Sequence, residues 1–179
     1  MQALLRLSRA IDWINDHFGR FAGWMIVLSC AVSAANAMIR YAFGISSNAF
    51  LEVQWYMFAA AVMLGTSLTL RRNEHIRIDI IYLCYSDTAK HWVEIFGTLF
   101  FLLPMCLLMA WLSWPFFYES FLINEQSNNA GGLVRWPVKF LVPCGFVLLA
   151  AQGISQIIKR IAALRGRIAV DSRYERPLQ

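Results

Sequence analysis

Four long stretches of this chain carry no charged residue, and each is long enough to cross a lipid bilayer. A membrane-spanning helix needs about 20 predominantly apolar residues. The four stretches contain 19, 18, 24 and 19 residues, and a charged residue bounds each of them at both ends. They are Phe21–Ile39, Val53–Leu70, Ile95–Tyr118 and Phe140–Ile158. The sequence therefore predicts an integral membrane protein with four spans.

The apolar residues of each stretch run continuously instead of alternating with polar ones. Inside a bilayer every backbone donor and acceptor must be paired within the protein, so only helices or a closed β-barrel can span it. Continuous runs favour helices. We therefore expect an all-α fold with one four-helix transmembrane domain over residues 1–179. The predicted spans cover about 20–42, 51–70, 92–118 and 138–160.

Residues 1–19 show a different pattern, because their apolar positions recur at spacings of three and four. These positions are Leu4, Leu7, Ile11, Ile14 and Phe18. Such spacing places them on one face of a helix. The segment is predicted to be an amphipathic helix on the inner leaflet, with Trp13 at the level of the lipid headgroups. The alternative is that it packs against a partner subunit. Residues 165–179 form a polar tail that we expect to be loose.

The distribution of basic residues predicts the orientation. With both termini in the cytoplasm, 13 of the 16 Lys and Arg residues lie on that side and three lie outside. Basic residues that flank spans remain cytoplasmic, so we expect both termini inside. The basic inner face suits anionic membrane lipids. Nucleic-acid binding is not expected, because these charges are divided among three separate segments beside the membrane.

No charged residue lies inside the four uncharged stretches, so the sequence predicts no catalytic residue at depth in the membrane, and we expect no enzyme activity. His17, His75 and His91 lie outside the spans, and no Cys/His cluster occurs, so no metal site and no cofactor are predicted. Glu52, at the outer mouth of the second span, is either a solvated carboxylate or one that pairs with a neighbouring helix. A few uncharged polar residues inside spans are expected to hydrogen-bond between helices. They are Thr66, Ser67, Gln152 and Gln156.

Several short motifs occur in a characteristic order. Glu52 opens the second span, Leu64-Gly65 lies in its inner half, and the sequence RRNEHIRID follows over residues 71–79. Later come GGLVRWPVK over residues 131–139 and PCGF over residues 143–146. In this order and spacing the chain resembles the small membrane subunit of tripartite ATP-independent periplasmic (TRAP) transporters, the DctQ-like family, over roughly residues 10–160.

The resemblance implies a small, non-catalytic permease subunit in the inner membrane of bacteria. In such systems a periplasmic binding protein delivers an organic acid to a large membrane subunit, which moves it together with sodium. The small subunit would act as a scaffold for the large one, and its expected partners are therefore the large permease subunit, the binding protein and membrane lipids. Two alternatives remain open: an autonomous four-helix carrier, and a lipid-interacting membrane scaffold.

Two candidate interaction surfaces follow. Ala59–Ala61 and Gly65 would permit close approach of another helix, and Trp55 supplies an aromatic anchor near the outer interface. The predicted interface with the large subunit comprises Glu52, Trp55, Gly65, Arg71, Arg72, His75, Arg77 and Asp79. The outer loop Glu119–Trp136 is a candidate docking surface for the binding protein, because its charges would steer encounter. Those charges belong to Glu119, Glu125 and Arg135. The alternative is that the loop only connects the third and fourth spans and rests on the large subunit.

Overall fold

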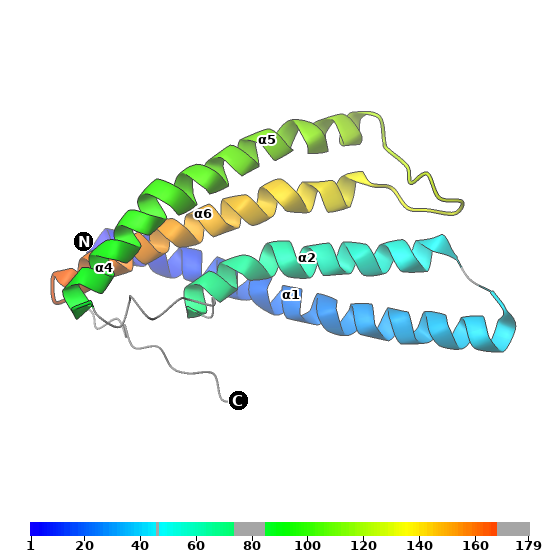
Figure 1. The fold of residues 1–179 in the computed structure, drawn as a ribbon, viewed down its shortest axis with the longest axis horizontal. Helices are drawn as coiled ribbons and strands as arrows, with labels where there is room; N and C mark the ends of the chain where they lie inside the picture. Colours follow the sequence, from blue (N-terminus) through cyan, green and yellow to red (C-terminus); the bar gives the residue numbers. More distant parts are fainter. Residues whose placement is uncertain (46, 74–84, 168–179) are drawn as a thin grey trace.

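The computed structural model describes residues 1–45, 47–73 and 85–167 of the chain, and these residues are almost entirely helical (Figure 1). Four helices in the described part are long and apolar enough to cross a membrane, which confirms the predicted fold class. A single antiparallel bridge joins Gln126 to Val134 in a loop. The elements are α1 (Gln2–Phe43), α2 (Asn48–Arg72), α4 (Asp87–Gly97), the π-helical turn η1 (Thr98–Leu102), α5 (Leu103–Leu122) and α6 (Trp136–Leu164).

The helices form two antiparallel hairpins, α1 with α2 and α5 with α6, and the hairpins meet where α2 packs on α6 (Figure 1). Near the N-terminus α1 crosses over to contact α6 as well. The turn between α1 and α2 and the loop between α5 and α6 lie at one end of the bundle. The N-terminus, α4 and the end of α6 lie at the other. We call these the outer end and the inner end, after the orientation that the basic residues predict.

The first helix is one continuous element of 42 residues, which at 1.5 Å per residue is about 63 Å long. The structure therefore joins the predicted amphipathic segment to the first span without a helix boundary near residue 19. Its buried face is polar in this part, since Ser8, Asp12 and Asn15 point into the protein. Its apolar face points outward, with Leu4 and Leu7 about half exposed. That arrangement suits a helix whose outer surroundings are lipid or another membrane protein.

Small residues let the helices approach closely at their crossing points, as is common inside membranes. Ala22, Ala60 and Leu64 form a buried cluster between α1 and α2. Gly145 brings α6 so close to α2 that an added Cβ would lie 2.8 Å from the carbonyl oxygen of Met63. No side chain fits there without moving a helix backbone.

The third span bends at a π-helical turn, where the N–H of Leu103 bonds to the carbonyl of Thr98, five residues earlier. Pro104 follows directly, and it has no N–H to continue the regular α-helical pattern. A proline and a π-turn are both established causes of bends in helices. The turn lies against Gly153 of α6, where an added Cβ would be 2.9 Å from the Leu102 side chain.

Candidate functional site

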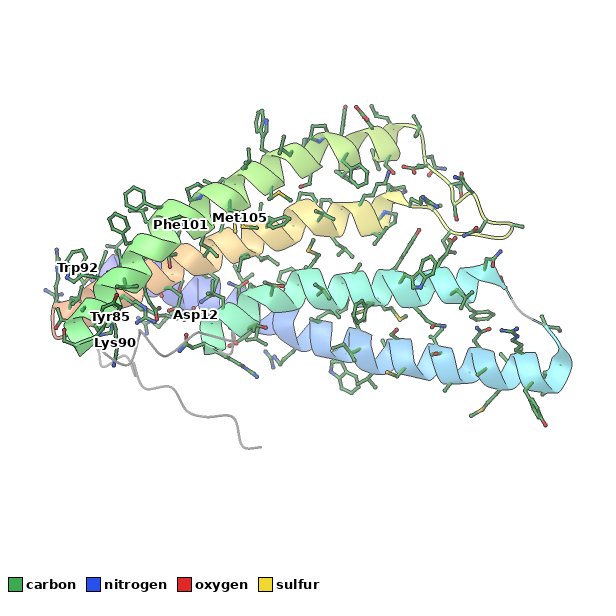
Figure 2. The ribbon with its side chains drawn as sticks, viewed as in Figure 1. Asp12, Tyr85, Lys90, Trp92, Phe101 and Met105 are labelled. Carbon is green, nitrogen blue, oxygen red and sulfur yellow. The ribbon has the colours of Figure 1, made fainter. Side chains whose placement is uncertain are left out.

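A cluster of polar side chains at the inner end joins α1 to α6, and its hydrogen bonds and ion pair converge on Asp12, which is labelled in Figure 2. One carboxylate oxygen of Asp12 accepts hydrogen bonds from the Ser155 hydroxyl at 2.9 Å and from the Gln152 amide at 3.2 Å. The other lies 2.5 Å from the ammonium group of Lys159. The Asp12 side chain is only 12% exposed. A single buried carboxylate on α1 therefore receives three donors from α6.

Neighbouring positions extend the cluster along both helices. The hydroxyl oxygens of Ser8 and Ser155 lie 2.7 Å apart, and the Asn15 amide donates to the Gln152 side-chain oxygen at 2.7 Å. Ser8, Asn15, Gln152 and Ser155 are almost completely buried. Buried polar groups need partners, and linked hydrogen bonds of this kind favour one particular arrangement of the helices.

Arg71, the penultimate residue of α2, brings this helix into the same cluster. Its guanidinium donates to the backbone carbonyl of Asp12 at 3.1 Å and forms an ion pair with Asp16. The Gln156 amide in turn donates to the carbonyls of Leu70 and Arg71, at 3.3 and 3.4 Å. The Leu70 carbonyl also accepts a hydrogen bond from the backbone N–H of Asn73, the residue that follows α2. The inner cluster thus fixes α1, α2 and α6 to one another.

A second charged contact fixes α4 to α6. Arg160 on α6 is only 5% exposed and forms an ion pair with Glu94. Its guanidinium also lies 3.1 Å from the Nδ1 atom of His91. The start of the third span is therefore held in place by the same helix that carries most of the inner cluster.

At the outer end the carboxylate of Glu52 organises the loop between α5 and α6. Glu52 is 4% exposed; it accepts hydrogen bonds from the Ser127 hydroxyl, from the Asn129 amide at 2.9 Å and from the Leu133 backbone N–H at 2.7 Å. A Cβ added at Gly132 would lie 2.9 Å from the Glu52 carboxylate. Glu52 is therefore buried and not paired with a neighbouring helix in the described part of the chain, where its hydrogen-bond partners belong to the loop.

Further contacts give this outer loop a defined shape. The Tyr56 hydroxyl donates to the carbonyl of Val134 at 3.2 Å, and the Asn48 amide donates to the carbonyl of Ala130 at 3.0 Å. Glu125 and Lys139 form an ion pair across the base of the loop. The hydrogen bond from Lys139 holds the pKa of the Glu125 carboxyl below its ordinary value. The loop is thus anchored to α2 and α6.

The predicted interface residues fall in different surroundings. Glu52 and Arg71 make the intramolecular contacts described above, and Gly65 faces Ala22 of α1, with 3.5 Å between an added Cβ and the alanine methyl. Trp55 is 65% exposed and Arg72 is also exposed. The remaining predicted residues lie outside the described part of the chain. They are His75, Arg77 and Asp79.

The three residues predicted to dock the binding protein also differ from one another. Glu119 is exposed near the end of α5, whereas Glu125 is half-buried against Lys139 and Arg135 is half-buried beside it. A shallow pocket of about 360 Å³, lined in part by Trp55, Arg135 and Lys139, opens next to the loop. Contact of any of these residues with a partner stays a prediction.

The sequence pattern predicted only part of the inner cluster. Helix-to-helix hydrogen bonds are confirmed for Gln152 and Gln156, whereas Thr66 and Ser67 bond to carbonyls of their own helix. The central role of Asp12 was not predicted. In the sequence, the polar residues at positions 8, 12 and 15 of α1 lie four and three residues apart. The polar residues at positions 152, 155 and 159 of α6 show the same two spacings in the opposite order, as expected for two antiparallel helices that pair these positions.

The clusters are suited to fixing helices and a loop in place, since their charges pair within the protein. In the described residues no group of three or more His, Cys, Asp or Glu side chains could hold a metal ion.

Comparison with known proteins points to one family. A family model described as "Tripartite ATP-independent periplasmic transporters, DctQ component" matches residues 29–163. No curated protein and no solved structure matches this chain. The matched region includes Glu52, the outer loop and all of the α6 side of the inner cluster, and it covers well over half of the 179 residues. The chain is therefore a multi-pass membrane protein of the DctQ family, a component of TRAP transporters.

Proposed function

We propose that this chain is the small, non-catalytic permease subunit that supports the large subunit of a TRAP transporter in the bacterial inner membrane. The complex would take up an organic acid, delivered by a periplasmic binding protein, by coupling its entry to sodium. The family match supports a role in transport. The choice of a scaffold role depends on how the charged residues of this chain are used.

The observation that carries the proposal is the pairing of the buried charges at the ends of the helices. Asp12 pairs with Lys159, Arg160 with Glu94, and Glu52 binds the outer loop. Removing one member of a buried ion pair is strongly unfavourable, because the other charge is left without a partner. These contacts favour one fixed arrangement of helices, which is what a supporting subunit requires.

The outward surface of the helices supports the same role. On α5 and the adjoining π-helical turn, the side chains of Phe101, Met105 and Trp111 are 73%, 52% and 77% exposed. Figure 2 labels Phe101 and Met105. Large apolar side chains exposed over this length suit contact with lipid or with another membrane protein. A chain with a fixed polar interior and an apolar outer surface is well suited to position a second membrane protein in the bilayer.

The outer loop gives the proposal a second contact, with the binding protein. Because Glu52, Tyr56 and Asn48 hold the loop in one shape, the loop can present a preformed surface. Glu119 is the most accessible of the three charges predicted there, and rim charges of this kind affect the rate of encounter more than the affinity.

The association itself can be tested directly. The chain, carrying an affinity tag, would be isolated in mild detergent from membranes that also contain the large permease subunit. We expect the large subunit to be retained in a fixed ratio to the tagged chain. Isolation of the tagged chain without the large subunit, under conditions that keep both proteins folded, would contradict the proposal.

A further inference from the structure

The pocket of about 360 Å³ beside the outer loop lies where three helices meet. Its walls come from α2, α5 and α6, and both α2 and α5 pack on α6. Each of these helices contributes a large apolar side chain, from Trp55, Phe116 and Val142 respectively. Arg135 and Lys139 line the same pocket. We call it the outer pocket.

The charged and the apolar walls of the outer pocket lie at different depths. Trp55, Phe116 and Val142 all belong to uncharged stretches, whereas Arg135 and Lys139 come just before the fourth of these stretches. From Arg135 to Val142 the chain rises by about 10 Å along α6, away from the outer end. A cationic rim therefore stands above an apolar floor. A phospholipid presents its phosphate and its acyl chains in the same order.

The two cations of the rim lie where the helix itself does not favour them. Arg135 is the residue that caps α6, and Lys139 is the fourth residue of that helix. A positive charge at the N-terminus of a helix is unfavourable unless an anion lies nearby. Lys139 has Glu125 as its partner. The half-buried guanidinium of Arg135 forms no hydrogen bond or ion pair with another described residue, so its donors are free to bind an anion.

Two carboxylates of the chain lie near Arg135 without binding it. Glu52 and Glu125 are close enough to attract its guanidinium. However, Glu52 is bound by donors of the outer loop, and Glu125 is bound by Lys139. A guanidinium can donate two parallel hydrogen bonds to a phosphate, and basic pockets between membrane helices suit phosphate-bearing lipid headgroups.

We propose that the outer pocket binds a phospholipid of the outer leaflet, with its phosphate on Arg135 and an acyl chain on the floor formed by Trp55, Phe116 and Val142. Lys139 adds a second positive charge, and its ammonium group lies 4.1 Å from the centre of the Phe116 ring, between rim and floor. The inference goes beyond the proposed function and does not depend on it. It gives Arg135 a lipid as its partner in place of the binding protein.

The size and the polarity of the outer pocket favour a lipid over part of another protein. Two turns of a helix about 10 Å wide occupy roughly 850 Å³, more than twice the volume of about 360 Å³ that the pocket offers. A single carboxylate side chain from a partner would reach Arg135 but would leave the apolar floor uncovered. A phospholipid fills both parts. The 65% exposed side chain of Trp55 also suits the interfacial region of a membrane, where tryptophan is enriched.

The test measures the binding of two lipids to the full chain in detergent by native mass spectrometry. The lipids are phosphatidylglycerol and a diacylglycerol with the same acyl chains, which lacks the phosphate. We expect phosphatidylglycerol to bind at least about tenfold more tightly, as a charge-assisted hydrogen bond implies. Arg135→Gln should remove most of this difference and leave the binding of diacylglycerol unchanged. Val142→Trp fills the floor and should weaken the binding of both lipids.

Two control variants match these changes in charge and in bulk. Arg40→Gln removes one positive charge from an exposed position, also at the outer end. Val147→Trp adds the same bulk to a position of α6 that is 56% exposed. Both should bind phosphatidylglycerol like the unchanged chain. Equal losses for Arg135→Gln and Arg40→Gln would indicate only a general attraction of anionic lipid to the outer end, and would overturn the inference.

A second measurement uses the unchanged protein in membranes that also contain the large subunit, and so does not depend on the folding of any variant. A phosphatidylglycerol with a photoactivatable diazirine in its acyl chain would be added and activated by light. The labelled peptides would then be identified by mass spectrometry. We expect label on peptides that contain Trp55, Phe116 or Val142, and we expect excess unlabelled phosphatidylglycerol to reduce it.

The outcomes separate this inference from the proposed function. Equal binding of the two lipids, or no effect of Arg135→Gln, would overturn the phosphate site. If the outer pocket takes no label and Arg135→Gln instead weakens capture of the large subunit, the pocket receives a carboxylate of that protein and the inference is overturned. If the unchanged chain binds phosphatidylglycerol as expected but fails to capture the large subunit, only the proposed function is wrong.

Discussion

The Asp12 carboxylate offers the sharpest test of whether the inner cluster holds the helices together. Asp12→Ala leaves the Lys159 ammonium, the Ser155 hydroxyl and the Gln152 amide without their shared acceptor. Removing one partner of a buried ion pair costs about 3–5 kcal/mol. The Lys159 side chain is 22% exposed, so part of its charge regains water and the lower end of that range applies.

This loss should be visible in thermal unfolding of the purified chain in detergent, followed by circular dichroism. For a chain of this size, each kcal/mol shifts the midpoint of unfolding by about 2–4 °C. We therefore expect Asp12→Ala to lower Tm by about 6–12 °C. Adding Lys159→Met should restore part of the loss, because the double variant no longer contains an unpaired buried charge.

Asp16→Ala is the matched control, since it removes a carboxylate from the same helix. Asp16 also pairs with Arg71, but its side chain is 38% exposed, and exposed ion pairs contribute about 0–1 kcal/mol. Its Tm should fall by no more than about 4 °C. Equal losses for the two variants, or no gain from adding Lys159→Met, would refute the reasoning.

Three further predictions concern packing, pH and orientation. Gly145→Leu should destabilise the chain by about 1–3 kcal/mol or more, because α2 lies against that position. Gly23→Leu is the control, since nothing lies within 4 Å of an added Cβ there. Equal Tm values for the two variants would contradict the close packing of α6 on α2 at Gly145. The pKa of Glu125 in the folded protein lies below its ordinary value of 4.5. Its ion pair should therefore stabilise the outer loop fully above about pH 4.5, and this stabilisation should be lost as the pH falls through the lowered pKa. This loss of stabilisation should appear as faster hydrogen exchange of the loop at low pH in the unchanged chain but not in Glu125→Gln. Identical pH profiles for the two proteins would exclude a role of the Glu125 ion pair in holding the loop. Reporter fusions at Asn128 and Gln179 should lie on opposite sides of the membrane, and a periplasmic C-terminus would overturn the orientation.

The spans could be predicted from the sequence, because uncharged runs of 18 to 24 residues match the thickness of a bilayer and exceed the usual length of a buried core helix. The sequence was less informative about residues 1–19. Their apolar stripe was recognised, but the structure shows their polar face buried and their helix continuing into the first span. Periodicity identifies two faces of a helix, and in a membrane either face can be the one that points into the protein.

The polar clusters were harder to predict, because each joins residues that are far apart in the sequence. Asp12 and Lys159 meet only because α1 crosses to α6 at the inner end. Glu52 was recognised as unusual, but its burial depends on how the loop over residues 123–135 folds back onto α2. The small size of Gly65 predicts a close neighbour, and in the structure that neighbour is Ala22 on α1. Small residues indicate close packing without indicating the partner.

Uptake by reconstituted liposomes tests the central claim most directly. Liposomes would contain the large subunit alone, this chain alone, or both, with the binding protein loaded with an organic acid on the outside and an inward sodium gradient. The account predicts sodium-dependent uptake only when both membrane subunits are present. Uptake by this chain alone would show that it is a carrier in its own right, and full uptake by the large subunit without it would show that no supporting subunit is required; either result would contradict the account.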